Sequence, residues 1–258
     1  MNKDLTWKLK QQPTAGELAE LVKNNVITPD EARDIIFNKG KREDASRATT
    51  VVHMLLDASG SMESCRNETI KGYNEYVNSL KKDGGKYKFS LHTFDSDMTG
   101  KLRLNTIHDK VFVDDVPELN RETYVPEGGT PLYDAFCTTL KTAKSKKGEK
   151  HLFVVMTDGE ENMSKEYKDS DMKSLKSEYE DGENWTFVYL GANQDAWSTA
   201  KNWGFSSSNV SNFNTTSKGM NQAFVSLSAA TRSYSGSASM STSAFYTDDQ
   251  KKENEDTK

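Results

Sequence analysis

The sequence has little cysteine and no hydrophobic run long enough to cross a membrane. Its two cysteines, Cys65 and Cys137, are too few for a disulfide framework, and neither has a second Cys or His at zinc-finger spacing. No apolar stretch approaches the roughly 18 residues of a membrane span, and the first residues lead into a polar stretch and not into a signal peptide. These absences exclude a disulfide-stapled scaffold, a zinc finger and a membrane helix, and we expect a soluble, cytoplasmic protein.

A large excess of charge of one sign is also missing. The 258 residues include 34 Lys and Arg against 39 Asp and Glu, a formal net charge of −5. This mildly acidic balance argues against a nucleic-acid-binding surface. Apolar residues make up 34% of the chain and glycine adds 16 residues, which together stay below the roughly 45–50% usual for globular chains. We therefore expect part of the chain to be solvated.

The two ends of the chain differ in composition from its middle. Residues 1–48 are polar, with Leu18, Leu21 and Val22 at helical spacing, and a second helix is predicted to begin at Thr28, which is followed by proline. These features predict a helical hairpin, which either packs on the main domain or docks another protein. Residues 233–258 begin with serine at alternate positions and end in a charged run, so we predict a disordered tail.

Residues 49–232 alternate strand and helix patterns. Three nearly continuous apolar runs, at 49–56, 151–156 and 185–190, are typical of strands covered on both faces. Helical patterns separate them, while 101–104 and 111–113 resemble two further short strands. This alternation predicts an α/β domain with a mostly parallel sheet between helices. In such sheets, binding sites gather at the carboxyl ends of the strands.

Polar residues follow the first apolar run directly. Asp57, Ser59 and Ser61 occupy alternate positions there, so one carboxylate and two hydroxyls can converge on a small volume. Such oxygen atoms suit a hard divalent cation such as Mg²⁺. The alternative is a helix N-terminus capped by Asp and Ser, which is common.

Two later segments favour the metal interpretation. Asp158 follows the second apolar run, and Thr130 follows two glycines, Gly128 and Gly129, just before a predicted helix. The three segments together resemble the von Willebrand factor type A family with its metal-ion-dependent adhesion site, whose pattern is Asp-x-Ser-x-Ser, then Thr, then Asp. The matching positions in this chain are Asp57, Ser59, Ser61, Thr130 and Asp158.

The resemblance implies both a fold and a function. The fold would be a doubly wound, Rossmann-like six-stranded sheet of order 3-2-1-4-5-6, with one antiparallel edge strand. Ser59, Ser61 and Thr130 would coordinate Mg²⁺ or Mn²⁺, and Asp57 and Asp158 would act mostly through water. A protein partner would complete the coordination with an Asp or Glu. We therefore expect a protein-binding module for adhesion or assembly and not an enzyme, with no membrane or nucleic-acid partner and with a possible second partner at the hairpin.

Two other functions stay open from the sequence. Asp57 after a strand resembles the aspartyl nucleophile of metal-dependent phosphatases, although Ser59 stands where such enzymes usually carry a second acid. The other alternative is a phage structural or assembly subunit with an incidental metal, because residues 189–196 resemble stand-alone prokaryotic and prophage members of the family. A phage-encoded protein would be associated with the virion or its assembly.

One further acidic segment has two interpretations. Asp95, Ser96 and Asp97 follow the strand pattern of residues 86–94. They could add negative charge near the metal, but an Asp-Ser-Asp sequence is more often a turn.

Overall fold

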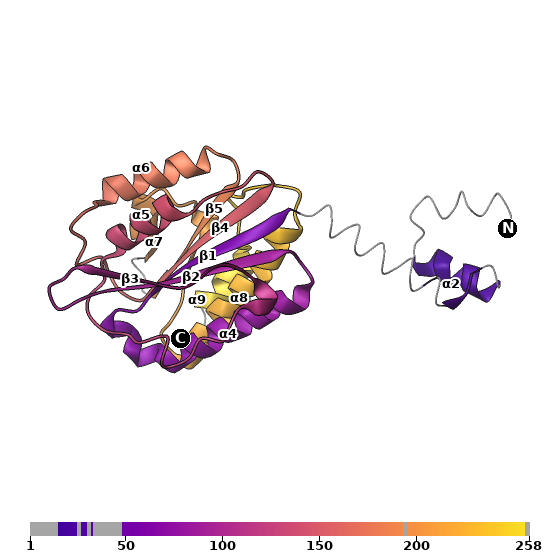
Figure 1. The fold of residues 1–258 in the computed structure, drawn as a ribbon, viewed down its shortest axis with the longest axis horizontal. Helices are drawn as coiled ribbons and strands as arrows, with labels where there is room; N and C mark the ends of the chain where they lie inside the picture. Colours follow the sequence, from indigo (N-terminus) through magenta and orange to yellow (C-terminus); the bar gives the residue numbers. More distant parts are fainter. Residues whose placement is uncertain (1–14, 25–26, 30–31, 33–47, 193–195, 256–258) are drawn as a thin grey trace. The chain divides into compact units, whose positions relative to one another are not determined.

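The computed structural model describes residues 15–24, 27–29, 32, 48–192 and 196–255 (Figure 1). The chain divides into two compact units, residues 1–47 and 48–258. The first unit contains helix α2 (Ala15–Lys23). The second helix of the predicted hairpin lies mostly outside the described residues, so the hairpin stays a prediction. No helix among the described residues is long and apolar enough to cross a membrane.

The second unit is built on a six-stranded sheet of order β3-β2-β1-β4-β5-β6. Only β3 is antiparallel to its neighbour, and the other neighbouring strands run parallel. The strands are β1 (Thr49–Asp57), β2 (Tyr87–Ser96), β3 (Leu102–Phe112), β4 (Glu149–Thr157), β5 (Trp185–Gly191) and β6 (Val210–Asn212). The predicted strand order and the antiparallel edge strand are therefore confirmed.

Helices cover both faces of this sheet. The α-helices are α4 (Arg66–Asp83), α5 (Leu132–Thr142), α6 (Asp169–Glu180), α7 (Ala196–Asn202), α8 (Ser217–Gly236) and α9 (Asp248–Glu255). Helices α5, α6 and α7 lie on one face, and α4, α8 and α9 lie on the other (Figure 1). Short 3-10 helices at Gly60–Cys65, Val113–Asp115 and Ser207–Asn209 complete the described elements.

The central strands bury both of their faces. In β1, Met54 belongs to the core on the α4 and α8 side, and the adjacent Leu55 belongs to the core on the α5 side. Successive side chains of a strand point to opposite faces, so a strand covered on both sides must be apolar at nearly every position. This requirement explains the continuous apolar runs of β1, β4 and β5.

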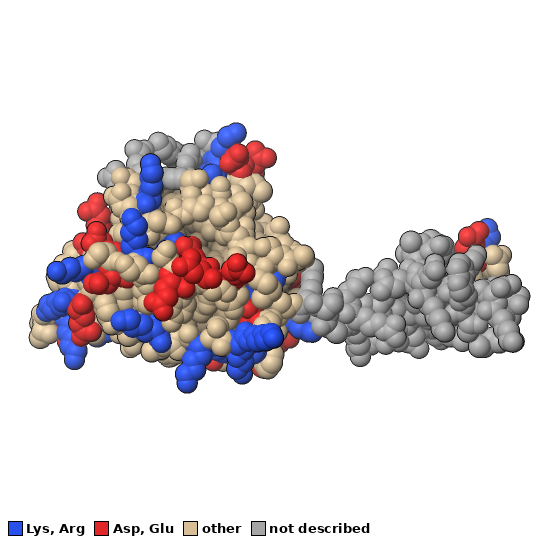
Figure 2. Space-filling view, turned by 90° about the horizontal axis from the view of Figure 1, so that it is seen from above, with Lys and Arg blue, Asp and Glu red and all other residues tan. Residues whose placement is uncertain are grey.

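The charge on one helical face is mixed. Seen from the side of α6, the described residues of the second unit present acidic side chains near the middle of the face (Figure 2). Lysine and arginine side chains stand mainly around them. Both signs of charge are therefore present on this face.

The antiparallel edge strand differs from its prediction. The sequence predicts two short pieces, at 101–104 and 111–113, but β3 runs unbroken over Leu102–Phe112. Most of its residues are partly or fully exposed, because an edge strand packs on one neighbour only. The polar residues in its middle, such as Asn105 and Asp109, therefore interrupt the apolar pattern by which a strand is recognised in the sequence. The pairing of β2 with β3 also shifts register near Leu91.

The prediction of a disordered tail over residues 233–258 is wrong for the part that the structure describes. Helix α8 continues to Gly236, and α9 follows at Asp248–Glu255. Between them, Phe245 and Tyr246 are 5% and 3% exposed and pack edge to face, with ring centroids 4.9 Å apart. The serine-rich composition hides these two aromatic anchors.

Buried polar side chains hold this C-terminal segment. The Lys150 ammonium, from β4, donates to the backbone oxygens of Tyr234 (3.1 Å) and Ser237 (2.5 Å) and so stabilises the end of α8. Asn254, which is fully buried, accepts a hydrogen bond from the Ser226 hydroxyl (2.8 Å) and donates to that of Ser211 (2.7 Å). Asn254 thereby joins α9 to both α8 and β6.

Candidate functional site

The first part of the candidate site lies at the carboxyl end of β1. Asp57 is the last residue of that strand and is fully buried. One carboxylate oxygen accepts a hydrogen bond from the Ser59 backbone N–H (2.7 Å), and the other accepts one from the Thr157 hydroxyl at the end of β4 (2.5 Å). The parallel register that pairs Leu56 with Met156 brings these two strand ends side by side. The Asp57 carboxylate is therefore fixed between the two central strands.

Side chains link the two strand ends a second time. The hydroxyl oxygens of Ser59 and Ser61 are 3.1 Å apart, and Ser61 donates to Asp158 Oδ1 at 2.6 Å. Ser61 lies in the 3-10 turn Gly60–Cys65 that leads into α4, and Asp158 follows β4 directly. Three oxygen-bearing residues from two loops thus form one connected group.

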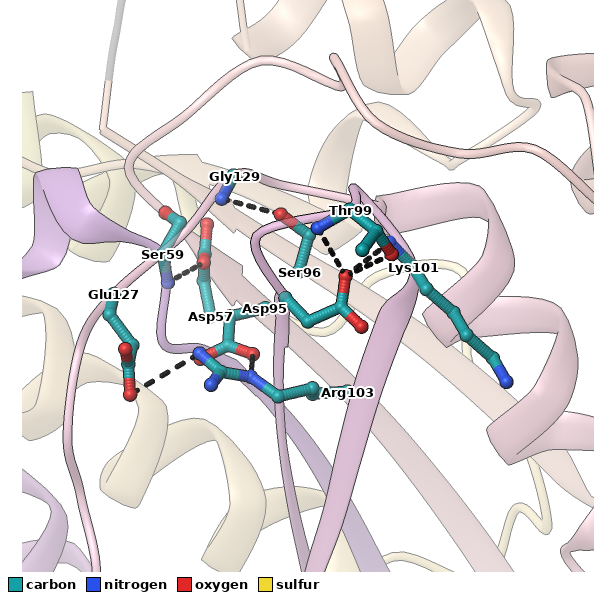
Figure 3. A network of polar contacts seen from close by, with 10 residues as sticks. Asp57, Ser59, Asp95, Ser96, Thr99, Lys101, Arg103, Glu127 and Gly129 are labelled. Atoms are coloured by element: carbon teal, nitrogen blue, oxygen red, sulfur yellow. Dashed lines mark hydrogen bonds and ion pairs between the residues drawn. The ribbon is translucent and has the colours of Figure 1, made fainter.

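The third part is the loop before α5, which carries Thr130. Its position depends on glycine, because Gly128 has a φ of +68° and a Cβ there would lie 2.0 Å from the backbone oxygen of Ser96. The Gly129 N–H donates to the Ser96 hydroxyl at 2.8 Å (Figure 3). The Thr130 N–H donates to Asn162 Oδ1 at 2.9 Å, and Thr130 itself is 2% exposed. The side chains of Ser96 and Asn162 therefore fix this loop, whose backbone conformation at Gly128 requires glycine.

All three parts face one small space beside Gly159. A Cβ built on Gly159 would lie 3.1 Å from Thr130 Oγ1, 3.7 Å from Ser61 Oγ and 3.9 Å from Asp57 Oδ2. The absence of a side chain at Gly159 keeps this space open. The three atoms nearest to this point are hydroxyl and carboxylate oxygens, which is the donor chemistry that hard cations such as Mg²⁺ and Mn²⁺ take. The residues present therefore fit a divalent cation.

The donor set contains few formal charges. Among the described residues, no group of three or more His, Cys, Asp and Glu could hold a metal ion. The carboxylates of this site are those of Asp57 and Asp158, and the other oxygens belong to neutral hydroxyls. A cation held here would keep much of its positive charge unneutralised.

Burial and mutual repulsion act on the two carboxylates. Burial raises the pKa of Asp57 to about 6, against the lowering effect of its hydrogen bonds from Thr157 and Ser59, and the nearby Asp158 raises it further. Burial also raises the pKa of Asp158, although the hydrogen bond from Ser61 opposes the shift. A bound dication would favour the charged form of both groups.

The charge of Asp95 is compensated within its own network. Asp95 is 3% exposed and forms two short bonds with the Arg103 guanidinium, of 2.6 and 2.8 Å (Figure 3). Arg103 also lies 3.3 Å from Glu127, which is on the loop that leads to Thr130. Asp95 is therefore neutralised by Arg103, and the interpretation that this residue adds negative charge near the metal is wrong.

The turn interpretation holds for one of the three residues in that segment. Asp97 Oδ1 accepts hydrogen bonds from the backbone N–H groups of Thr99 (2.8 Å) and Lys101 (2.9 Å), which closes the turn between β2 and β3. Asp95 and Ser96 are still part of β2. The role of Ser96 in holding Gly129 was missed, because no spacing pattern in the sequence marks it.

The structure brings all five residues of the predicted motif to the carboxyl edge of the sheet. Asp57 ends β1, Ser59 and Ser61 follow it, Thr130 lies in the loop before α5, and Asp158 directly follows β4. The residues that orient them, Thr157, Asn162 and Ser96, have no sequence pattern of their own.

Comparison with solved structures shows the same fold in other proteins. The minor pilin PilB from Streptococcus sanguinis matches with 12% identity and a TM-score of 0.54, over 72% of this chain and 62% of PilB. The pilus adhesin SpaC from Lactobacillus rhamnosus GG, in its open conformation, matches with 11% identity and a TM-score of 0.57, over 73% of this chain and 30% of SpaC.

A third similar structure holds a metal. Proximal thread matrix protein 1 from the mussel byssus, with a zinc-occupied MIDAS motif, matches with 14% identity and a TM-score of 0.50. The match covers 69% of this chain but only 47% of the mussel protein. No curated protein matches the sequence.

The sequence profile of the von Willebrand factor type A domain matches residues 52–231. This match spans more than half of the chain and includes the whole sheet except the first residues of β1. The chain belongs to the von Willebrand factor type A domain family.

Proposed function

We propose that this protein is a divalent-cation-dependent protein-binding module. Ser59, Ser61 and Thr130 would hold Mg²⁺ or Mn²⁺ directly, with Asp57 and Asp158 around it, and an Asp or Glu of a protein partner would complete the coordination. The observation that carries this proposal is the space beside Gly159, whose three nearest atoms are oxygens of Thr130, Ser61 and Asp57.

The charge of the site favours an acidic ligand. Two carboxylates can at most balance a dication, and hydroxyl ligands leave it strongly electrophilic. An incoming carboxylate is a hard, charged oxygen ligand of the kind that Mg²⁺ and Mn²⁺ prefer. The metal would thus supply Lewis acidity for binding a partner, and the protein's own residues would supply the position.

The same geometry disfavours the phosphatase interpretation. A nucleophilic carboxylate needs a free oxygen directed at the substrate, but both oxygens of Asp57 accept hydrogen bonds, from the Ser59 N–H and the Thr157 hydroxyl. Asp57 is also fully buried. Its environment suits a fixed electrostatic role.

Two of the similar structures are of proteins with the kind of property proposed here. The mussel protein has zinc in its MIDAS motif, and SpaC is a pilus adhesin. At 11–14% identity these likenesses concern the fold, so the metal and the partner of this chain are to be tested directly.

The first test measures stabilisation by metal. For the wild type, Mg²⁺ at ~100 times its Kd should raise the free energy of unfolding by about 2.7 kcal/mol over EDTA. Asp158→Asn should remove most of this gain, whereas Asp169→Asn, an exposed change at the start of α6, should retain it. Identical unfolding curves of the wild type in Mg²⁺, Mn²⁺ and EDTA would contradict the metal site.

The second test measures partner binding. A pull-down in Mg²⁺ and in EDTA should recover a protein in Mg²⁺ only. Thr130→Ala should weaken its binding more than it weakens metal binding, because Thr130 is the one hydroxyl carried by a glycine-hinged loop. Thr130→Ser keeps the hydroxyl and should keep the binding. A complex that forms equally in EDTA would overturn the proposal.

A further inference from the structure

A cavity adjoins the candidate metal site at Gly159. It has a volume of ≈ 240 Å³ and lies on the α5 and α7 side of β5, and we call it the aromatic pocket. Three aromatic side chains and two acidic residues line most of it: Tyr133, Tyr189, Trp203, Glu160 and Glu161. The rings of Tyr133 and Tyr189 each meet that of Trp203 edge to face, with centroids 5.6 Å apart. The aromatic wall is therefore a packed and defined surface.

The aromatic pocket and the metal site share one residue. Gly159 lines the pocket, and the position of its missing Cβ is the point that Thr130, Ser61 and Asp57 surround. A single polypeptide segment bound at the metal would therefore pass next to the pocket.

Tyr189 gives the pocket a polar group without a partner. Its side chain is 3% exposed and lines the cavity, yet no hydrogen bond reaches its hydroxyl from the residues that the structure describes. The hydroxyl oxygen is not among the fully buried atoms that lack a partner, so it reaches the open space of the cavity. Burial raises the pKa of Tyr189, and the negative charges of Asp57 and Glu160 act in the same direction. The hydroxyl is thus available to a ligand in an acidic environment.

The acidic residues keep the pocket negative even when a dication balances Asp57 and Asp158. Glu161 is fixed by hydrogen bonds from the backbone N–H groups of Tyr133 (3.0 Å) and Ser164 (2.7 Å). Glu160 is exposed and belongs to none of the ion pairs among the described residues. Aromatic faces next to carboxylates attract ammonium and guanidinium groups. The chemistry of the pocket therefore selects a cation.

The size of the pocket indicates a side chain. Pockets for drug-sized molecules usually measure roughly 300–1,000 Å³, and ≈ 240 Å³ is smaller. One long Lys or Arg side chain meets the requirements of size, charge and hydrogen bonding together.

We propose that the aromatic pocket receives a Lys or Arg side chain of the same partner whose carboxylate completes the metal site. The partner would therefore present an acidic and a basic side chain close together on one segment. This inference rests on the proposed function for the identity of the partner, but the cation pocket itself can be tested without metal.

The first experiment tests the pocket alone, on the full chain in EDTA. The probe is n-butylguanidinium, its neutral counterpart is n-butylurea, and the signal is the indole N–H resonance of Trp203. The guanidinium should shift this resonance in a saturable way and the urea should not. Glu160→Gln should weaken binding about threefold, and Tyr189→Phe, which keeps the ring, should also weaken it. Glu178→Gln, an exposed change on α6 outside the pocket, should have no effect.

Two results of this experiment would overturn the inference. One is the absence of a saturable shift with n-butylguanidinium. The other is equal binding of the urea, which would show that the pocket recognises shape and not charge.

The second experiment separates the inference from the proposed function. Random peptides displayed on a carrier are selected on the full chain in Mg²⁺, and they should be enriched in an Asp or Glu near a Lys or Arg. Selection on Glu160→Gln should keep the acid and lose the base. Enrichment of the acid without the base would overturn the pocket and leave the proposed function standing. Enrichment of the base alone, unchanged by EDTA, would support the pocket and contradict the proposed function.

Discussion

The loops at the carboxyl edge of the sheet and the C-terminal segment 237–255 both carry many polar residues, but they use them in opposite ways. In the edge loops, oxygens of Thr130, Ser61 and Asp57 face an open space at Gly159. In the C-terminal segment, buried polar groups form hydrogen bonds with other groups of the protein. Asn254, for example, bonds the hydroxyls of Ser211 and Ser226 and is fully buried. Polar side chains directed at a common space provide a binding site, whereas those directed at other protein groups hold the chain together.

Asn209 illustrates the second use. Its amide donates to the backbone oxygens of Phe187 and Thr242, both at 3.0 Å, and accepts from the Phe245 N–H at 3.0 Å. One buried side chain thus joins β5 to two points of the C-terminal segment. A backbone without regular secondary structure obtains its hydrogen bonds in this way.

The largest expected effect comes from removing the C-terminal segment. Deletion of residues 237–258 removes the buried Phe245, Tyr246 and Asn254 and exposes the surfaces that they cover. Loss of one buried Phe side chain alone typically costs about 3–5 kcal/mol, so we expect the free energy of unfolding to fall by at least about 4 kcal/mol. Urea denaturation of the full and shortened chains measures this difference. Equal midpoints would show that the segment does not pack as described, and the comparison would fail.

The next effect separates the edge loops from the core. Gly159→Ala places a methyl group 3.1 Å from the Thr130 hydroxyl, in the space proposed for the metal. It should remove most of the roughly 2.7 kcal/mol gained at ~100 Kd of Mg²⁺ and change the stability in EDTA little. Gly182→Ala is the matched control, because its Cβ meets a backbone oxygen at a similar 3.2 Å in a remote turn. Full metal stabilisation in Gly159→Ala would place the cation elsewhere.

Much of the sheet could be predicted from the sequence because burial on both faces forces continuous apolar runs. The residues 151–156 and 185–190 predict β4 and β5 for this reason. The edge strand β3 was split in the prediction, since a strand with one covered face tolerates residues such as Asn105 and Asp109. Local sequence patterns reveal buried strands, and β3 is little buried.

The candidate site and the C-terminal segment both contain contacts that the sequence could not predict. The motif residues Asp57, Ser59 and Ser61 stand close in sequence and could be found, but Ser96 acts on Gly129 across 33 positions. The packing of Phe245 and Tyr246 likewise depends on residues far away in the chain, such as Asn209. Long-range hydrogen bonds of single side chains leave no local pattern, so only the structure reveals them.

A smaller effect is expected at Asn254. Asn254→Ala leaves the hydroxyls of Ser211 and Ser226 without this partner in a buried place, which typically costs about 1–3 kcal/mol. Lys252→Ala, an exposed change on the same helix, should alter stability by less than about 0.5 kcal/mol. Urea denaturation in EDTA is the measurement, and the gain from Mg²⁺ should be the same in both variants. A selective loss of metal stabilisation in Asn254→Ala would mean that the two regions are coupled.

The smallest effect should occur at Ser96, which lies next to the edge loops but serves them as a structural group. Ser96→Ala removes the hydroxyl that accepts from the Gly129 N–H, and the loss of one such bond should lower stability by about 1 kcal/mol. Because Gly129 precedes Thr130, the Thr130 hydroxyl becomes less fixed, so the Mg²⁺ concentration needed for half of the full stabilisation should also rise. Ser174→Ala, an exposed change on α6, is the control and should change neither quantity. If Ser96→Ala lowers stability and leaves the Mg²⁺ dependence intact, then Asn162 alone holds Thr130 in place, through the hydrogen bond to its N–H, and Ser96 belongs with the polar groups that only join the chain.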